Sequence, residues 1–156
     1  MPHQFHAYDQ GFVDAIRAGG PDANGLPAER DVSDGAGNPC RSCLRGIPQG
    51  EAMLILAARP FETLQPYAET GPIFLCEKPC APWRGPGIPP ILTTSPEYLL
   101  KGYSPDHRIV YGTGTIVGVD RLEDYASMVL KDARVAYVDV RSARNNCFLT
   151  RMTATT

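Results

Sequence analysis

The stretch "NPCRSCLRGIPQGEAMLIL", residues 38–56, joins a Cys40-x-x-Cys43 pair to an abruptly apolar run through a spacer that contains proline and glycine. The apolar residues 53–58 have the length of a buried strand, and Pro60 ends the run. A cysteine pair of this spacing in front of a strand has three interpretations: half of a metal site, a redox pair, or two buried thiols. The other cysteines of the chain help to choose among them.

A second cysteine pair, Cys76-x-x-x-Cys80, follows the segment "TGPIFLC" at 70–76, which is predicted to be a second buried strand. If this strand pairs with the one at 53–58, both cysteine pairs meet at one end of the sheet. Structural zinc sites favour four thiolate ligands in a tetrahedron. The sequence therefore predicts a zinc site formed by Cys40, Cys43, Cys76 and Cys80.

The residues around the first pair are typical of a zinc knuckle, in which a tight turn directs both sulfurs to one point. In this interpretation Ile47 packs beneath the site and Gly50 permits the turn into the next strand. A redox pair normally lies at a helix N-terminus, whereas residues 44–48 after Cys43 are too short and broken for a helix. Arg41 and Arg45 would still favour a thiolate, so redox chemistry and plain buried thiols remain alternatives.

The composition predicts one loop-rich domain spanning residues 1–156, with 15 glycines and 15 prolines. A chain of this length buries enough surface to fold without disulfides or a metal. The predicted class is α+β: a largely antiparallel sheet, two helices and long Pro/Gly-rich loops. Helices are predicted at 9–18 and 121–131, and strands at 53–58, 70–76, 98–103, 108–117, 134–140 and 147–152. Residues 19–50 and 78–96 are predicted to be mainly turns and loops, with Trp83 either covering an apolar surface or lying in an interface.

The second predicted helix carries the clearest signals. Asp120 and Glu123 are spaced as a capping box, with aspartate in place of serine or threonine. The apolar stripe that follows has helical spacing and comprises Leu122, Tyr125, Ala126, Val129 and Leu130. In the 108–117 segment, period-two alternation predicts one arm of a hairpin, with Ile109, Tyr111, Thr113, Thr115 and Val117 on one face.

Charge and hydropathy exclude some classes of partner. The net charge is -2 and the basic residues are scattered, which predicts no nucleic-acid partner. No window approaches the roughly 18 apolar residues of a membrane span, and the first residues lack the pattern of a secretory signal. We therefore expect no membrane association and a cytoplasmic location, where the five cysteines are reduced thiols or metal ligands.

Several stretches resemble one bacterial protein family, the domain of unknown function 1203. They are "PCR" at 39–41, the Leu44 to Glu51 stretch, "PYAETGPIF" at 66–74, and the 134–141 segment with Cys147. The resemblance extends over nearly the whole chain, but it implies no activity because the family has none established. The commoner family pattern has only the first cysteine of the opening pair and lacks the 76/80 pair, so it implies that a metal site here belongs to a subset of the family.

A polar pocket is a further hypothesis. Its predicted residues are Arg41, Glu51, Arg59, Tyr67 and Cys147, with Glu69 and Thr70 beside Tyr67. In an enzyme, Cys40, Arg41 and Glu51 would line the pocket and Cys147 would serve as nucleophile or partner. The alternatives are a buried strand position for Cys147, and a strand entry with surface ion pairs for the others.

Two other patterns are weaker. The segment "YGTGTIVG" at 111–118 imitates a dinucleotide fingerprint, but a strand continues through it and the helix begins separately. The histidines form no metal or acid/base set, with His3 and His6 expected in a mobile terminus and His107 in an exposed turn.

Three function classes remain: a binding module for a small molecule or protein, an enzyme, and a thiol-based sensor of oxidants or metal. The first is favoured, and a second copy of the chain is among the partners left open.

Overall fold

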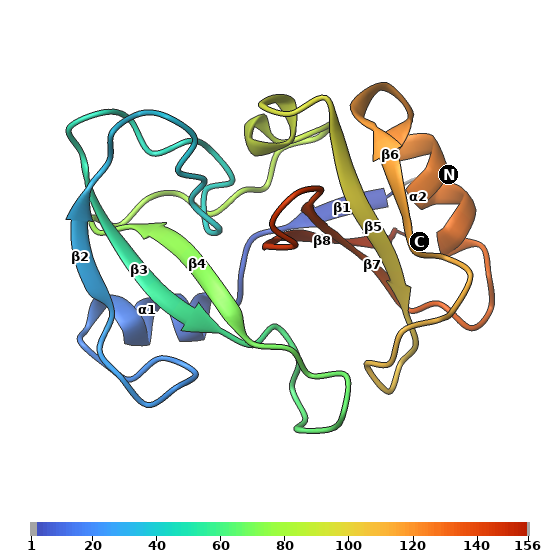
Figure 1. Cartoon of the computed structure of the whole chain (residues 1–156), viewed down its shortest axis with the longest axis horizontal. Helices are drawn as coiled ribbons and strands as arrows, with labels where there is room; N and C mark the ends of the chain where they lie inside the picture. Colours follow the sequence, from blue (N-terminus) through green and yellow to red (C-terminus); the bar gives the residue numbers. More distant parts are fainter. Residues whose placement is uncertain (1–2, 156) are drawn as a thin grey trace.

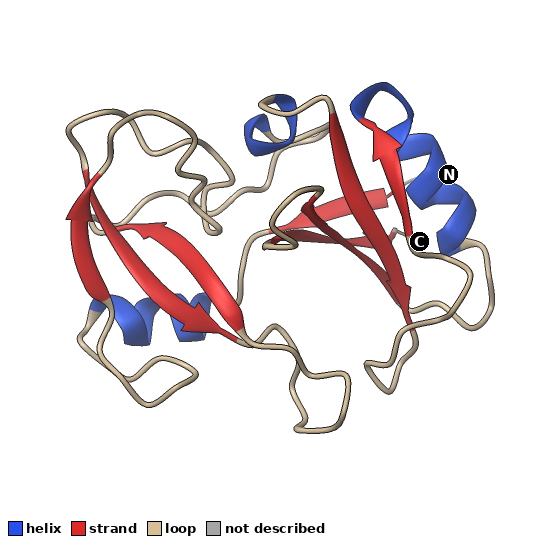
Figure 2. Ribbon diagram, in the orientation of Figure 1, coloured by secondary structure: helices blue, strands red, loops and turns tan. Residues whose placement is uncertain are grey.

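Two antiparallel sheets lie side by side, each with one α-helix packed against it (Figures 1 and 2). The computed structural model describes residues 3–155. The larger sheet has the order β1-β8-β7-β5-β6 and the smaller has the order β2-β3-β4. The strands are β1 (His3–His6), β2 (Glu29–Val32), β3 (Ala52–Ala58), β4 (Gly71–Cys76), β5 (Glu97–Tyr103), β6 (Thr115–Gly118), β7 (Tyr137–Ser142) and β8 (Phe148–Ala154). The predicted α+β class is confirmed.

Pairing within the three-stranded sheet brings the two cysteine pairs together. Strands β3 and β4 pair antiparallel, with Met53 opposite Cys76, so the condition on which the convergence of the two cysteine pairs depends is met. Helix α1 (Gln10–Arg17) covers this sheet (Figure 1). The side chain of Asp9 caps it by accepting a hydrogen bond from the Phe12 backbone N–H. Val13 and Ile16 are the buried helix positions, and they join the small-sheet core.

Helix α2 (Leu122–Leu130) packs on the five-stranded sheet. Four positions of its predicted stripe are buried, namely Leu122, Ala126, Val129 and Leu130, and the fifth, Tyr125, is partly buried and packs against the same core. The predicted capping box is wrong. A 3₁₀ turn over Val119–Arg121 runs directly into the helix, which places Arg121 at the N-cap without a side-chain capping bond. The apolar face, rather than a cap, therefore accounts for this helix.

The N-terminal segment is more ordered than the sequence predicts. Strand β1 pairs with β8, and the His3 imidazole lies 2.7 Å from a carboxylate oxygen of Glu123, so the expectation of a mobile terminus is wrong. His107, expected to be exposed, is half-buried, with Nδ1 2.9 Å from the Tyr137 hydroxyl. Strand β2, within a segment predicted to be turns, is a fully exposed edge strand of the small sheet.

The predicted strand at 108–117 is mostly irregular. Only Thr115–Gly118 forms β6, which pairs antiparallel with β5. Tyr111, predicted to share a face with Val117, is 71% exposed, whereas Val117 is buried. The hairpin relationship therefore holds at β6 and at a single bridge between Ile109 and Tyr103, with irregular chain between them.

The knuckle segment, residues 39–47, joins the two sheets. The Arg41 backbone N–H donates to the Phe74 carbonyl of β4, and the Arg41 carbonyl accepts from Tyr8 N–H. Leu44 inserts into the core of the five-stranded sheet and is completely buried. Cys40, Cys43 and Ile47 belong instead to the core of the small sheet. The turn that carries the first cysteine pair therefore contributes to both cores.

Candidate metal centre

Four cysteine sulfurs converge at one end of the small sheet. The Sγ atoms of Cys40, Cys43, Cys76 and Cys80 all lie within 4.8 Å of one another, and the Cys40 and Cys80 sulfurs are 3.8 Å apart. A zinc–sulfur bond of about 2.3 Å in a regular tetrahedron places sulfurs about 3.8 Å apart. The spacing of the four thiols is therefore suited to one metal ion. Within residues 3–155 this is the one group of three or more His, Cys, Asp or Glu side chains with metal-ligand spacing.

Backbone hydrogen bonds shape the turn that presents Cys40 and Cys43. The Cys40 N–H donates to the Arg45 carbonyl and the Leu44 N–H donates to the Cys40 carbonyl, at 2.9 and 3.0 Å. Leu44 closes the turn in the left-handed region, with φ of 55°, which is uncommon for a non-glycine residue. Burial of its side chain in the larger core offsets this strain.

The second pair is placed by strand β4. Cys76 is its last residue, and its backbone N–H donates to the Cys40 sulfur at 3.3 Å. Cys80 returns from the loop that follows, and its sulfur accepts a hydrogen bond from Arg17 Nη2 at 3.2 Å. Helix α1, the knuckle segment and the end of β4 thus all contact the cluster.

The surroundings of the cluster fit the predicted knuckle. Cys40 is fully buried, Cys43 is 8% exposed, and Ile47 packs with both in the small-sheet core. Gly50 has φ of 87°, so a glycine is needed for the turn into β3.

The close approach of the sulfurs perturbs their protonation. The pKa of Cys40 is lowered to about 6, first by a hydrogen bond from the Cys43 thiol and next by one from Cys76. The pKa of Cys80 is also lowered, mainly by hydrogen bonding from the Cys40 thiol and further by the other two thiols and Arg17. The pKa values of Cys43 and Cys76 are raised because these thiols act as donors. Four sulfurs this close favour partial deprotonation, the form that binds a cation.

The site offers metal binding more readily than redox exchange. All five cysteines are free thiols. Cys43 leads into the tight turn at Leu44, so it lacks the helix N-terminus that usually activates a redox Cys-x-x-Cys pair.

The five residues of the predicted polar pocket are distributed over the molecule. The Arg41 side chain is buried in packing, where Nε donates to the Phe148 carbonyl at 2.8 Å and Nη1 donates to the Pro39 carbonyl at 2.7 Å. Burial lowers the pKa of Arg41 to about 10, against the opposing influence of Cys147 and Cys40. Arg41 therefore ties the knuckle segment to β8.

The other members of that set lie apart. Glu51 is exposed before β3, and its carbonyl accepts from the Ser33 N–H. Tyr67 pairs its hydroxyl with that of Tyr111 at 2.9 Å. Arg59 lines a cavity of about 650 Å³, and Cys147 lines a separate cavity of about 210 Å³. Glu69, Thr70 and Arg141 also line the smaller cavity. Cys147 therefore lies near Glu69 and Thr70, the two residues that the sequence analysis grouped with Tyr67.

Sequence reasoning missed two features of the sites. The sequence placed Arg17 in a helix and gave it no role at a site. The fold shows that its guanidinium donates a hydrogen bond to the Cys80 sulfur. The larger cavity is lined from β1, the β1–α1 connection, α1, the α1–β2 loop, the β3–β4 loop and β8, and of its residues only Arg59 was a candidate. Trp83 does cover an apolar surface, because it packs against the core of the five-stranded sheet.

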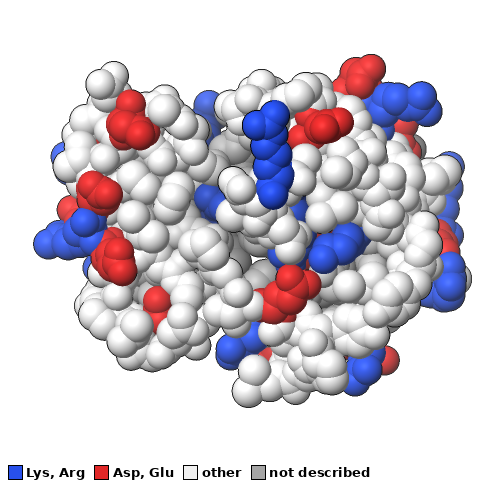
Figure 3. Space-filling model, viewed as in Figure 1, with Lys and Arg blue, Asp and Glu red and all other residues white. Residues whose placement is uncertain are grey.

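Charged side chains of both signs lie on the surface. On the face shown in Figure 3, acidic and basic side chains are interspersed rather than gathered in a basic stripe. No helix within residues 3–155 is long and apolar enough to cross a membrane.

The fold and the cluster define a small α+β protein with a four-cysteine candidate metal centre. The chain belongs to the family described as "Protein of unknown function (DUF1203)", whose model matches residues 37–153. That match includes all four clustered cysteines, while β1, α1 and β2 precede it. Comparison of the chain with curated proteins and with solved structures found no match.

Proposed function

We propose that this chain is a small-molecule-binding module in which Cys40, Cys43, Cys76 and Cys80 hold one structural Zn²⁺. The observation that carries the metal assignment is the gathering of four sulfurs within 4.8 Å of one another. Four thiolates favour zinc over calcium or magnesium, which prefer oxygen ligands.

The role of the ion is structural, because four protein ligands leave a tetrahedral zinc without an open position for substrate. The ion would link the knuckle segment, the end of β4 and the loop after it. Since the knuckle segment also contributes Leu44 to the larger core, the ion would stabilise the junction of the two sheets. A fixed junction favours binding of a ligand between rigid elements.

Metal analysis of protein purified without added metal tests the proposal. We expect about one zinc per chain, with Cys147 reacting freely with a thiol reagent and the other four cysteines reacting only after chelation or denaturation. Metal-free protein with five reactive thiols would contradict it, as would bound iron with visible absorbance.

Single substitutions add a matched comparison. Cys43→Ser and Cys80→Ser each remove one ligand and should lower zinc content and thermal stability together. Cys147→Ser removes a thiol outside the cluster and should leave zinc content unchanged. Equal zinc loss in all three variants would argue against the assigned ligand set.

A thiol-dependent enzyme is the second candidate, and one observation favours it. The half-buried Cys147 lines the 210 Å³ cavity together with Arg141 and Glu69, whose guanidinium and carboxylate lie 3.9 Å apart. Alkylation of Cys147 by iodoacetamide in zinc-loaded protein tests this candidate. A rate at least tenfold above that of free cysteine at pH 7 would favour catalysis, and an ordinary rate would favour packing.

A further inference from the structure

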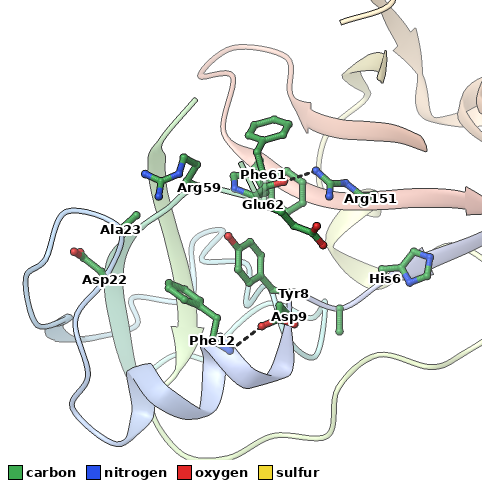
Figure 4. A pocket seen from close by; sticks show the side chains of 13 residues that line it. His6, Tyr8, Asp9, Phe12, Asp22, Ala23, Arg59, Phe61, Glu62 and Arg151 are labelled. Atoms are coloured by element: carbon green, nitrogen blue, oxygen red, sulfur yellow. Dashed lines mark hydrogen bonds between the residues drawn. The ribbon is translucent and has the colours of Figure 1, made fainter. Parts of the chain in front are cut away.

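The larger cavity lies between the two sheets and has the dimensions of a ligand site. Its volume of about 650 Å³ falls within the range usual for small-molecule pockets. One wall is the β1–α1 connection with the start of α1, the second is the β3–β4 loop, and the third is β8, while the α1–β2 loop adds Asp22 and Ala23 (Figure 4). We call it the Tyr8 cavity, because the Tyr8 ring stands within it.

Aromatic rings form the apolar part of the Tyr8 cavity. The Tyr8 ring lies 5.4 Å from that of Phe12 and 5.9 Å from that of Phe148, measured between centroids. Phe61 and Phe148 are buried, whereas Tyr8 and Phe12 are half-buried and keep part of their surface uncovered. Such a wall favours a flat apolar group that packs against ring faces and edges.

Two hydrogen-bond donors that line the cavity have no partner within residues 3–155. The Tyr8 hydroxyl and the Arg59 guanidinium make neither a hydrogen bond nor an ion pair there, and Figure 4 shows the hydroxyl directed to the side of Arg59 and Phe61. Burial raises the pKa of Tyr8 to about 12, although the charges of Arg151 and Arg59 oppose this rise. At neutral pH, Tyr8 is therefore an uncharged hydroxyl donor next to positive charge.

The acidic groups around the cavity are mostly engaged. Asp9 caps α1, and Asp22 accepts from three backbone N–H groups, including that of Ala57. Arg151 is paired with Asp139, and Glu62 is exposed to solvent. Arg59 is half-buried, so its unpaired charge is less screened than that of Glu62.

We propose that the Tyr8 cavity binds a small organic carboxylate with a planar aromatic body. The carboxylate accepts hydrogen bonds from Arg59 and the Tyr8 hydroxyl, and the ring packs on Tyr8 and Phe12. A carboxylate fits better than a phosphate because the cavity offers a single unpaired guanidinium, and Asp9 already occupies the N-terminus of α1. The inference rests on the proposed binding function and names its site and ligand class.

Binding of indole-3-acetate and of its neutral counterpart indole-3-acetamide tests the inference, measured by calorimetry and by NMR on the full, zinc-analysed chain. We expect the acid to bind at least tenfold more tightly than the amide and to shift resonances of Tyr8 and Phe12. Arg59→Met should reduce acid binding to the level of the amide, and Tyr8→Phe should weaken it severalfold. Arg144→Met removes an exposed charge outside the cavity and should leave binding unchanged.

The outcomes separate this inference from the zinc assignment. Equal binding of acid and amide, or binding unaffected by Arg59→Met, would overturn it, and so would tighter binding of phenyl phosphate or inorganic phosphate than of the acid. Protein that contains one zinc per chain and fails to bind the acid would refute the carboxylate site alone. Metal-free protein that binds the acid through Arg59 would support the site and refute the zinc.

Discussion

Arg17 of helix α1 donates from Nη2 to the sulfur of Cys80 at 3.2 Å and from Nε to the carbonyl of Cys76 at 3.1 Å. One guanidinium thus contacts both residues of the second cysteine pair. A zinc ion with four thiolates carries a net charge of −2, which a neighbouring cation and an N–H···S hydrogen bond would offset. The helix that covers the small sheet therefore also supports the candidate metal centre.

Replacing Arg17 with methionine should weaken metal retention while keeping the helix, because methionine is also a good helix former. Loss of such a supporting contact typically lowers metal affinity by about 10- to 100-fold. Competition with a chromogenic chelator measures the change. Arg84→Met removes an exposed charge from the loop after Cys80 and is the matched control. Equal affinity of the Arg17 variant and the wild type would show that the contact has no role in binding.

Leu44 should be among the most sensitive positions in the knuckle segment. It is completely buried in the larger core, so Leu44→Ala leaves a cavity and should lower the free energy of unfolding by about 2–5 kcal/mol. Urea titration of the zinc-loaded protein measures the change. Leu26→Ala, at a side chain that is 59% exposed, should have a small effect. A small effect at both positions would mean that the knuckle segment does not anchor the larger core.

The sequence predicts most of the elements that have a strong periodic signal. It predicts the cysteine cluster from the ligand-like spacing of the two pairs, and the cluster forms because β3 and β4 are paired. It fails for β1 and β2, since each has only four residues and β2 is an exposed edge whose residues are mostly charged. Hydrogen bonding to β8 and to β3 creates these strands, and such long-range pairing leaves no local pattern.

The same reason limits prediction of the sites. Spacing along the chain identified Cys40 with Cys43 and Cys76 with Cys80, but the Tyr8 cavity draws residues from β1 to β8. Arg59 was recognisable as a polar residue after a strand, whereas Tyr8 gave no signal before the sheets were placed. The capping-box pattern at Asp120 was misleading because a 3₁₀ turn precedes the helix and moves the N-cap to Arg121.

Protonation of His6 should lower the free energy of unfolding in mild acid. Its pKa is lowered from 6.5, first by burial and next by the charge of Arg151, so the folded state takes up a proton less readily than the unfolded state. The free energy of unfolding should therefore decrease as the pH falls below about 6.5. Urea titrations between pH 5 and 8 should show a shallower decrease for His6→Gln than for the wild type. If the free energy of unfolding of His6→Gln and of the wild type fell equally with pH, His6 would be excluded as the cause of the decrease. Release of a metal from the cysteines in acid would destabilise both proteins to the same extent.

The ion pair between Arg151 and Asp139 gives the largest electrostatic prediction. The Asp139 side chain is fully buried, and Arg151 contacts its two oxygens from Nε and Nη2 at 2.7 and 3.1 Å. Arg151→Met should lower the free energy of unfolding by about 3–5 kcal/mol, because it leaves a buried carboxylate without its cation. Adding Asp139→Asn should recover part of this loss, since the unpaired charge is then removed.

An exposed pair supplies the control for this prediction. Arg134 and Asp132 form an ion pair at 2.7 Å on the surface, where solvent screens the charges, so Arg134→Met should leave the unfolding transition nearly unchanged. Chemical denaturation of the four proteins under one set of conditions compares the two sites. If Arg151→Met were as mild as Arg134→Met, the Asp139 carboxylate would have to be protonated or hydrated in the folded protein. If the double variant were no more stable than Arg151→Met, the loss would instead come from the packing of Arg151 on Tyr137, whose ring centroid lies 3.8 Å from the guanidinium carbon.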